Sequence, residues 1–146
     1  MGDDDPHEKD LEFIQDIIAR LSGNSFKIKG WSITLIVVVL LFRTRDLHLL
    51  VAFIPLFGFW ILDAYYLKLE RRYRSMYKDA RTENQDRDQF EMDSSAYHVD
   101  SIPELMLSKS IALFHGTIFT LLSIYSMFVF VLWLFSKLLV YYSQFY

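Results

Sequence analysis

Three stretches of the chain contain no Asp, Glu, Lys or Arg: residues 30–42, 47–62 and 110–136. A transmembrane helix needs about 20 largely apolar residues to cross roughly 30 Å of hydrocarbon. Residues 47–67 and 111–139 meet this length. The first stretch has 13 residues, so it spans only if the flanking Lys and Arg side chains extend toward the headgroups. We therefore predict three transmembrane helices, with a re-entrant hairpin of the first two segments as the alternative.

Two further apolar patterns lie outside these spans. Leu11, Ile14, Ile18 and Leu21 recur at helical spacing on an otherwise acidic segment, which predicts an amphipathic helix that ends at residues 22–24. An apolar stripe also continues past the second span to about Arg81, on a segment with a basic flank. We expect the first helix to pack its apolar face against this stem, supported by opposite charges. The alternative is that both charge runs are solvated surfaces.

The segment at 83–100 is polar and lacks a helical period, so we predict a loop in which Phe90 and Met92 are the candidates for docking. Ser101, Pro103 and Glu104 then form a helix-start signature. The predicted fold is an all-α membrane protein with four segments. These are an acidic amphipathic cytoplasmic helix at 1–24, a transmembrane hairpin at 25–67, a cytoplasmic stem and acidic loop at 68–104, and a third transmembrane helix at 105–146.

The composition excludes several classes of protein, and the distribution of basic residues predicts the orientation in the membrane. Hydrophobic residues make up 53% of the 146 residues, and there are no cysteines, which argues against a soluble enzyme, a disulfide scaffold and a disordered chain. Basic residues near span ends are retained in the cytoplasm. If the N-terminus is cytoplasmic, twelve of the 15 Lys and Arg lie inside, and Arg43, Arg45 and Lys137 lie outside. We therefore predict a cytoplasmic N-terminus and an external C-terminus.

Asp63 is the most informative single residue, because an ionised carboxylate inside a membrane helix is costly without a partner. Helical rise places it roughly 7 Å inside the inner end of the second span. Lys29, Lys109 and His115 can reach a similar depth, so we predict an intramembrane polar cluster of these four residues. It acts either as a structural clasp, which we favour, or as a proton- or ion-sensitive gate.

The third span carries a face of small residues, which lets helices approach closely in lipid. Packing against the first two spans would explain this face, and so would self-association. Ile118 lies on the side that we expect to tolerate change. The face consists of Ser108, Ala112, Gly116, Thr120 and Ser123.

Recognisable catalytic patterns are missing from the sequence. It has no phosphate-binding glycine loop, no HExxH and no cysteine cluster, and its four His residues have no metal-ligand spacing. We therefore expect no enzyme activity, cofactor or metal, although an enzyme built around Asp63 and His115 is a minor alternative. We also expect no nucleic-acid binding, because a positive-inside anchor explains the basic stem, which consists of Lys68, Arg71, Arg72, Arg74, Lys78 and Arg81.

Several phrases together resemble a family of small uncharacterised multi-span proteins of the bacterial inner membrane. They are Asn24-Ser25-Phe26, Lys29-Gly30-Trp31, Thr34-Leu35, Phe59-Trp60-Ile61-Leu62-Asp63-Ala64-Tyr65-Tyr66-Leu67, Glu70-Arg71, Tyr77 and Ser108-Lys109-Ser110. Small proteins of this architecture are often effectors of anti-phage systems, opened or assembled by a partner or second messenger. By this analogy, we expect an effector that oligomerises, forms a pore or otherwise perturbs the inner membrane, in defence or stress. The alternative is a non-enzymatic membrane subunit or adaptor. The partners implied are membrane lipid, further copies of the chain, and a cytoplasmic protein or nucleotide signal.

Overall fold

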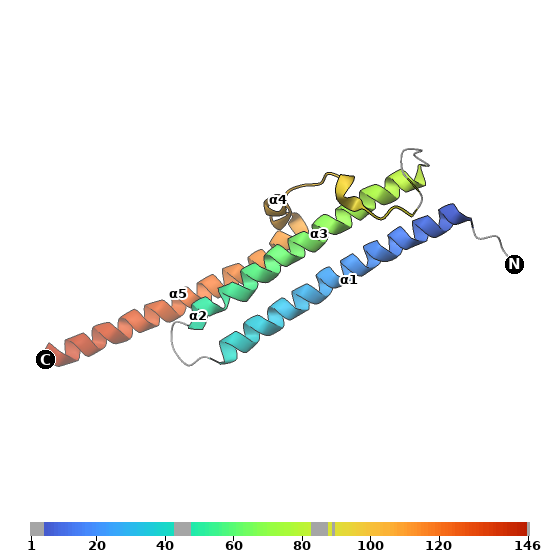
Figure 1. The fold of residues 1–146 in the computed structure, drawn as a ribbon. Helices are drawn as coiled ribbons and strands as arrows, with labels where there is room; N and C mark the ends of the chain where they lie inside the picture. Colours follow the sequence, from blue (N-terminus) through green and yellow to red (C-terminus); the bar gives the residue numbers. More distant parts are fainter. Residues whose placement is uncertain (1–4, 43–47, 83–87, 89, 146) are drawn as a thin grey trace.

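The computed structural model describes residues 5–42, 48–82, 88 and 90–145, and these form helices without any strand (Figure 1). Helices α1 (Pro6–Leu41) and α3 (Phe53–Arg81) form a long antiparallel hairpin, with the short α2 (His48–Val51) before α3. After a 3-10 turn, η1 (Ser94–Ala96), and a short α4 (Ile102–Met106), α5 (Lys109–Phe145) runs back along α3. Helix α3 is central, because both α1 and α5 pack on it.

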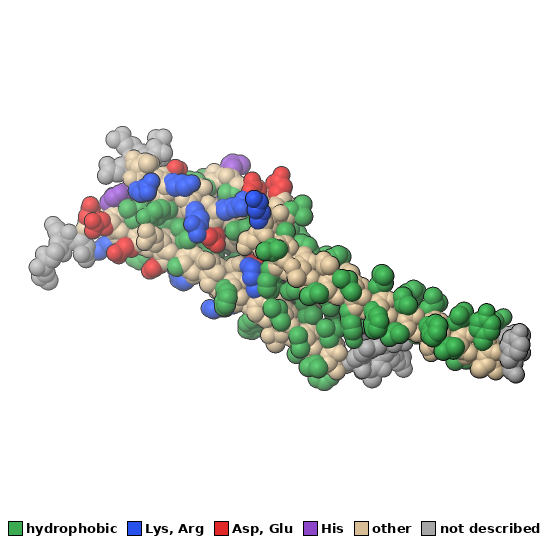
Figure 2. Space-filling view, turned by 180° about the vertical axis from the view of Figure 1, so that it is seen from behind, with side chains coloured by type: hydrophobic (Ala, Val, Ile, Leu, Met, Phe, Trp, Pro, Cys, Tyr) green, Lys and Arg blue, Asp and Glu red, His purple; other side chains and the backbone are tan. Residues whose placement is uncertain are grey.

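Three helical stretches are long and apolar enough to cross a membrane: Pro6–Leu41, Leu49–Arg81 and Lys109–Ser143. This confirms the all-α class and the number of candidate spans. Figure 2 shows charged side chains gathered at one end of the molecule and hydrophobic side chains covering the other. The link at 43–47, which would decide between a spanning and a re-entrant hairpin, lies outside the described residues.

Helix α1 is a single helix of 36 residues, so the predicted helix end at residues 22–24 is wrong. Glycine in a helix costs about 1 kcal/mol relative to alanine, and Gly23 alone favours a break. Packing against α3 on both sides of Gly23 offsets that cost, because Ile14 precedes it and Ile28 follows it on the buried side. Asp5 caps the start of the helix, and its carboxylate accepts a hydrogen bond of 3.1 Å from the His7 backbone N–H.

The predicted packing of the first helix on the stem is confirmed. Ile14 of α1 and Met76 and Ala80 of α3 form a buried apolar cluster. The Gln15 side-chain amide donates to the Tyr77 hydroxyl at 2.8 Å. Partly buried side chains complete this cluster from both helices and from the loop: Leu11, Ile18, Tyr73, Tyr77, Met92 and Tyr97.

The loop before α4 docks on this stem through both apolar residues that the sequence singled out. The Phe90 ring meets Phe13 edge to face, with centroids 6.1 Å apart, and its backbone N–H donates to the Asp10 carboxylate at 3.1 Å. The carbonyl of Met92 accepts a hydrogen bond of 3.1 Å from the Tyr73 hydroxyl. The stem and loop therefore form one folded unit.

The predicted helix start at Ser101 is confirmed, since Ser101 and Glu104 form a capping box at the start of α4. That helix ends at Met106, and α5 begins separately at Lys109. Farther along, Leu122 of α5 is buried in a second core with Ile36, Ala52 and Leu56. Every described residue from 130 to 143 is exposed, so this part of α5 extends beyond the hairpin (Figure 1).

Candidate functional site

Asp63 is fully buried and joins α1 to α3 and α5. One carboxylate oxygen accepts a hydrogen bond of 2.5 Å from the Ser25 hydroxyl. The other lies 2.7 Å from the Lys29 ammonium and 3.1 Å from His115 Nε2. Lys29 also donates to Ser25 at 2.8 Å. The carboxylate therefore has partners on both neighbouring helices, which is how a buried acid becomes tolerable in an apolar setting.

His115 is fully buried and held between rings. Its imidazole stacks on Trp60, with centroids 5.8 Å apart and planes 13° apart, and meets Phe114 edge to face. Because the carboxylate can only accept, the Nε2 atom facing it carries a hydrogen. The other ring nitrogen, Nδ1, is buried without a hydrogen-bond partner. The Trp60 indole N–H donates to the Met106 carbonyl at 3.0 Å, which ties α4 to the same cluster.

The structure brings together three of the four residues predicted for this cluster: Lys29, Asp63 and His115. Lys109 lies outside it, exposed at the start of α5, because six residues of helix place it about 9 Å from His115 along the axis. Sequence reasoning missed Ser25 and Trp60. Ser25 lies four residues before Lys29, and Trp60 three before Asp63, so helical spacing alone could have placed them on the same faces.

The connectivity of this cluster fits a clasp better than a hydrolytic centre. In a serine-histidine-acid triad, the histidine lies between the nucleophile and the acid. Here Asp63 lies in the middle, and it accepts from both Ser25 and His115. The hydroxyl of Ser25 therefore points its proton at a carboxylate that is already paired with Lys29. What the arrangement does is fix the relative positions of α1, α3 and α5.

The middle of the small-residue face of α5 borders an open groove in the single chain, where Ala112 and Gly116 are half-buried and Thr120 is exposed. Nothing lies within 4 Å of the position that a Cβ on Gly116 would take. Around it is a groove of about 420 Å³, lined by Ala112, Leu113, Gly116, Thr117, Thr120 and Leu121. The hydroxyls of Thr117 and Thr120 donate to carbonyls of their own helix at 2.6 and 2.8 Å. Packing against the first two spans thus does not explain the face at Gly116.

Of the other small residues, Ser108 and Ser123 are half-buried, and the Ser108 hydroxyl has no hydrogen-bond partner. The opposite side of α5 differs from the prediction. Ile118 packs against the core formed by Ile36, Leu56 and their neighbours, so the expectation that it tolerates change is wrong. The reason is that α3 lies against that side, as the buried His115 and Leu122 also show.

The predicted basic stem lies on α3, and some of its cations pair with carboxylates while others do not. Arg71 pairs with Asp100 of the loop. Arg74 pairs with Glu70 one turn away in its own helix, at 2.8 Å. Lys68, Arg72, Lys78 and Arg81 are the remaining members. Within the described part of the chain, neither Lys78 nor Arg81 has a carboxylate partner.

Two exposed carboxyl groups, one in the loop and one in α4, have lowered pKa values. Hydrogen bonds from the Ser101 hydroxyl and backbone N–H lower the pKa of Glu104. The pKa of Asp93 is lowered by the Ser95 backbone N–H and hydroxyl, with a smaller contribution from Arg72. Both carboxylates cap short helical turns, so their charged forms hold the loop geometry.

No protein-family model matches the chain, and neither a curated protein nor a solved structure is significantly similar to it. The features that bear on its function are therefore the clasp around Asp63, the open groove beside Gly116 and the stem.

Proposed function

We propose that this protein is an integral membrane effector that assembles through α5 and, as an oligomer, perturbs the membrane. The observation that carries the proposal is the open groove around Gly116, which the rest of the chain leaves uncovered. The most apolar window of α5 is only 11% buried, against 28% for the span that contains α3. The corresponding window of α1 is 17% buried, so α5 leaves the largest share of its surface available for contacts between copies.

Helices in lipid gain little from apolar burial alone, because the surrounding acyl chains are equally apolar. Close approach of backbones supplies the van der Waals contacts that hold such helices together. The small side chains at Ala112, Gly116 and Thr120 permit that approach, and the groove beside them accepts the larger side chains of a neighbouring helix. A second copy of α5 supplies side chains of this kind, including Leu113 and Leu121, whose exposed fractions are 75% and 63%.

The clasp supports this assembly by fixing one half of α5 against the hairpin. With Asp63 holding His115 in place, the open groove faces away from α3, and the exposed end of α5 from residue 130 to 143 extends into lipid. A rigid inner half and an unpacked outer half suit a protein whose neighbours in the membrane are copies of itself.

The proposed location is the bacterial inner membrane, with a cytoplasmic N-terminus and an external C-terminus. The twelve-to-three distribution of basic residues supports this orientation. The charged end of the molecule, built from α1, α3 and the docked loop, is then the cytoplasmic stem. A role in defence or stress rests only on the analogy of size and architecture with small multi-span effectors and belongs to the same proposal.

The test is induced expression in a bacterial host with a membrane-potential dye. Wild-type protein should depolarise cells, and Gly116→Leu should not, because a large side chain keeps the facing backbone away. Gly58→Leu is a matched control, since Gly58 also lies in an apolar helix with nothing within 4 Å of its added Cβ. Equal protein levels in membrane fractions are required. Equal loss of depolarisation in both variants would contradict assembly through α5.

A second candidate function is an adaptor that recruits a cytoplasmic partner. The observation that favours it is the folded stem, in which the loop docks on the Ile14–Met76 cluster instead of hanging free. Gly116→Leu protein that no longer assembles but still supports the cellular activity would favour the adaptor.

A further inference from the structure

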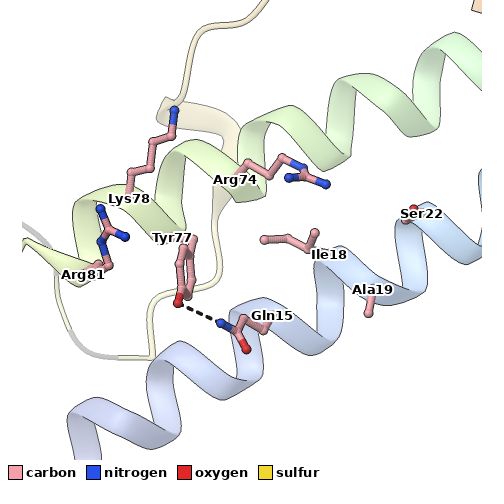
Figure 3. A pocket seen from close by; sticks show the side chains of 8 residues that line it. All are labelled: Gln15, Ile18, Ala19, Ser22, Arg74, Tyr77, Lys78 and Arg81. Atoms are coloured by element: carbon pink, nitrogen blue, oxygen red, sulfur yellow. Dashed lines mark hydrogen bonds between the residues drawn. The ribbon is translucent and has the colours of Figure 1, made fainter. Parts of the chain in front are cut away.

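Between α1 and α3, on the stem, lies a groove of about 610 Å³ that neither the clasp nor the α5 face uses (Figure 3). Its size falls within the roughly 300–1,000 Å³ typical of small-molecule sites. Tyr77 points across the groove to Gln15, which closes one side, and Ser22 faces α3 farther along. The lining is Gln15, Ile18, Ala19, Ser22, Arg74, Tyr77, Lys78 and Arg81.

The charge of this lining is one-sided. It includes three cations and no carboxylate, although the chain as a whole has a net charge of −3. Arg74, Lys78 and Arg81 are spaced four and three residues apart, so they form one stripe along α3, where like charges repel. Glu70 offsets Arg74 from outside the groove, but Lys78 and Arg81 have no such partner among the described residues. A bound anion would relieve this repulsion.

The rest of the lining is apolar or neutral and suits an organic group. Ile18 and Ala19 on α1 and the Tyr77 ring on α3 provide apolar surface. The Ser22 hydroxyl and the Gln15 amide add neutral hydrogen-bonding groups at the edge. The groove exists because α1 carries small side chains at Ala19 and Ser22 opposite the long cations of α3. A ligand that combines a phosphate with a ring fits both parts.

The depth of the groove separates two sources of phosphate. Ser22 lies eight residues before the first apolar segment, which is about 12 Å along a helix. Arg74 and Arg81 lie seven and 14 residues beyond Leu67, or about 10 and 21 Å. The headgroup layer is only roughly 5–8 Å thick on each side of the hydrocarbon. A lipid headgroup therefore does not reach most of the groove, whereas a soluble ligand does.

We propose that this groove binds a soluble phosphate ester of nucleotide size, with its ring against Ile18 and Tyr77 and its phosphates on Arg81 and Lys78. The Lys78 side chain is exposed and points away from α1 in Figure 3, so it turns toward the groove when the ligand binds. Arg74 adds a third cation at the membrane-proximal end. The site lies on the stem, so its binding test does not depend on assembly through α5. A ligand there bridges α1 and α3 and is placed to bias the packing of the hairpin.

The test is isothermal titration calorimetry of the full chain in phosphatidylcholine nanodiscs, with ADP, pyrophosphate and adenosine as probes. ADP should bind saturably and more tightly than pyrophosphate. Adenosine should bind at least about ten-fold more weakly than ADP, because it lacks the phosphates that accept charge-assisted hydrogen bonds from the cations of the groove. The double variant Lys78→Gln/Arg81→Gln should weaken ADP binding by about ten-fold or more. Lys68→Gln/Lys109→Gln removes the same charge outside the groove and should bind like wild type.

A charge-neutral variant separates shape from electrostatics. Ser22→Leu fills the groove and should weaken ADP binding while circular dichroism stays unchanged. Saturable binding by neither ADP nor pyrophosphate would overturn the proposal, as would equal losses in both double variants. Equal affinities for ADP and pyrophosphate would show that the apolar lining does not contribute to binding and would contradict the placement of the ring against Ile18 and Tyr77. ADP binding abolished by phosphatidylglycerol in the nanodiscs would assign the groove to lipid instead of a soluble ligand.

Discussion

Removal of the Asp63 carboxylate should destabilise the helical assembly strongly. In Asp63→Ala, three hydrogen bonds are lost, and His115 keeps a buried ring with both nitrogens unpaired, since Nδ1 already has no partner. Breaking a fully buried ion pair costs about 3–5 kcal/mol. The Lys29 side chain is 21% exposed, so its ammonium can turn toward headgroups and recover part of this cost. We expect a loss of about 2–4 kcal/mol in the free energy of unfolding.

The fluorescence of Trp60 reports this change, because its ring stacks on His115. The assay is equilibrium unfolding by dodecyl sulfate in mixed micelles, with Trp31→Phe and Trp133→Phe in the background so that Trp60 is the only indole. A loss below about 0.5 kcal/mol, which is typical of surface substitutions, would refute the clasp.

Two double variants show whether charge pairing is the cause. Replacing a buried pair by apolar residues is often neutral, so Asp63→Leu with Lys29→Met should recover most of the stability that Asp63→Leu alone loses. The charge-swapped pair Asp63→Lys with Lys29→Glu should restore part of it. Losses that simply add in these double variants would indicate that the two side chains do not interact.

Three further predictions concern the packing of α5, the topology of the hairpin and the cap of α4. Ile118→Ala should cost about 1–3 kcal/mol, because it leaves a cavity beside the Leu122 core, whereas Leu121→Ala on the exposed side should change unfolding little. If the hairpin spans, Thr44→Cys should react with a membrane-impermeant maleimide from outside the cell; a re-entrant hairpin should leave it protected. The Glu104 carboxyl should titrate below its ordinary 4.5 in NMR, so its capping contribution is present at neutral pH and lost as pH falls through the lowered pKa; titration at or above 4.5 would contradict the capping box.

The architecture could be predicted because its causes are local in the sequence. The apolar stripe from Ile14 and that around Met76 each have a helical period, and a short link between two apolar segments favours an antiparallel hairpin. The continuity of α1 through Gly23 could not be predicted in this way. It depends on packing against α3 on both sides of the glycine, which outweighs the intrinsic preference of the residue.

The site was predictable to the extent that depth in the membrane can be counted from the sequence. Such counting placed Lys29 and His115 near Asp63. The same counting puts Lys109 about 9 Å from His115 along the helix, so the prediction that Lys109 joins the cluster did not follow the spacing through, and Lys109 is exposed at the start of α5. Similarly, the basic stripe on α3 is visible in the sequence, whereas the groove beside it depends on which small residues of α1 lie opposite. That register follows only from the three-dimensional packing of the hairpin.

Cysteine crosslinking along α5 tests the proposed assembly position by position. The chain has no cysteines, so single substitutions from 110 to 124 can be oxidised in membranes without altering any other residue. We predict dimer yields that peak at 112, 116 and 120 and fall at 111, 115 and 118, where α3 covers the helix. Uniform yields along the helix, or peaks at the covered positions, would contradict the assembly.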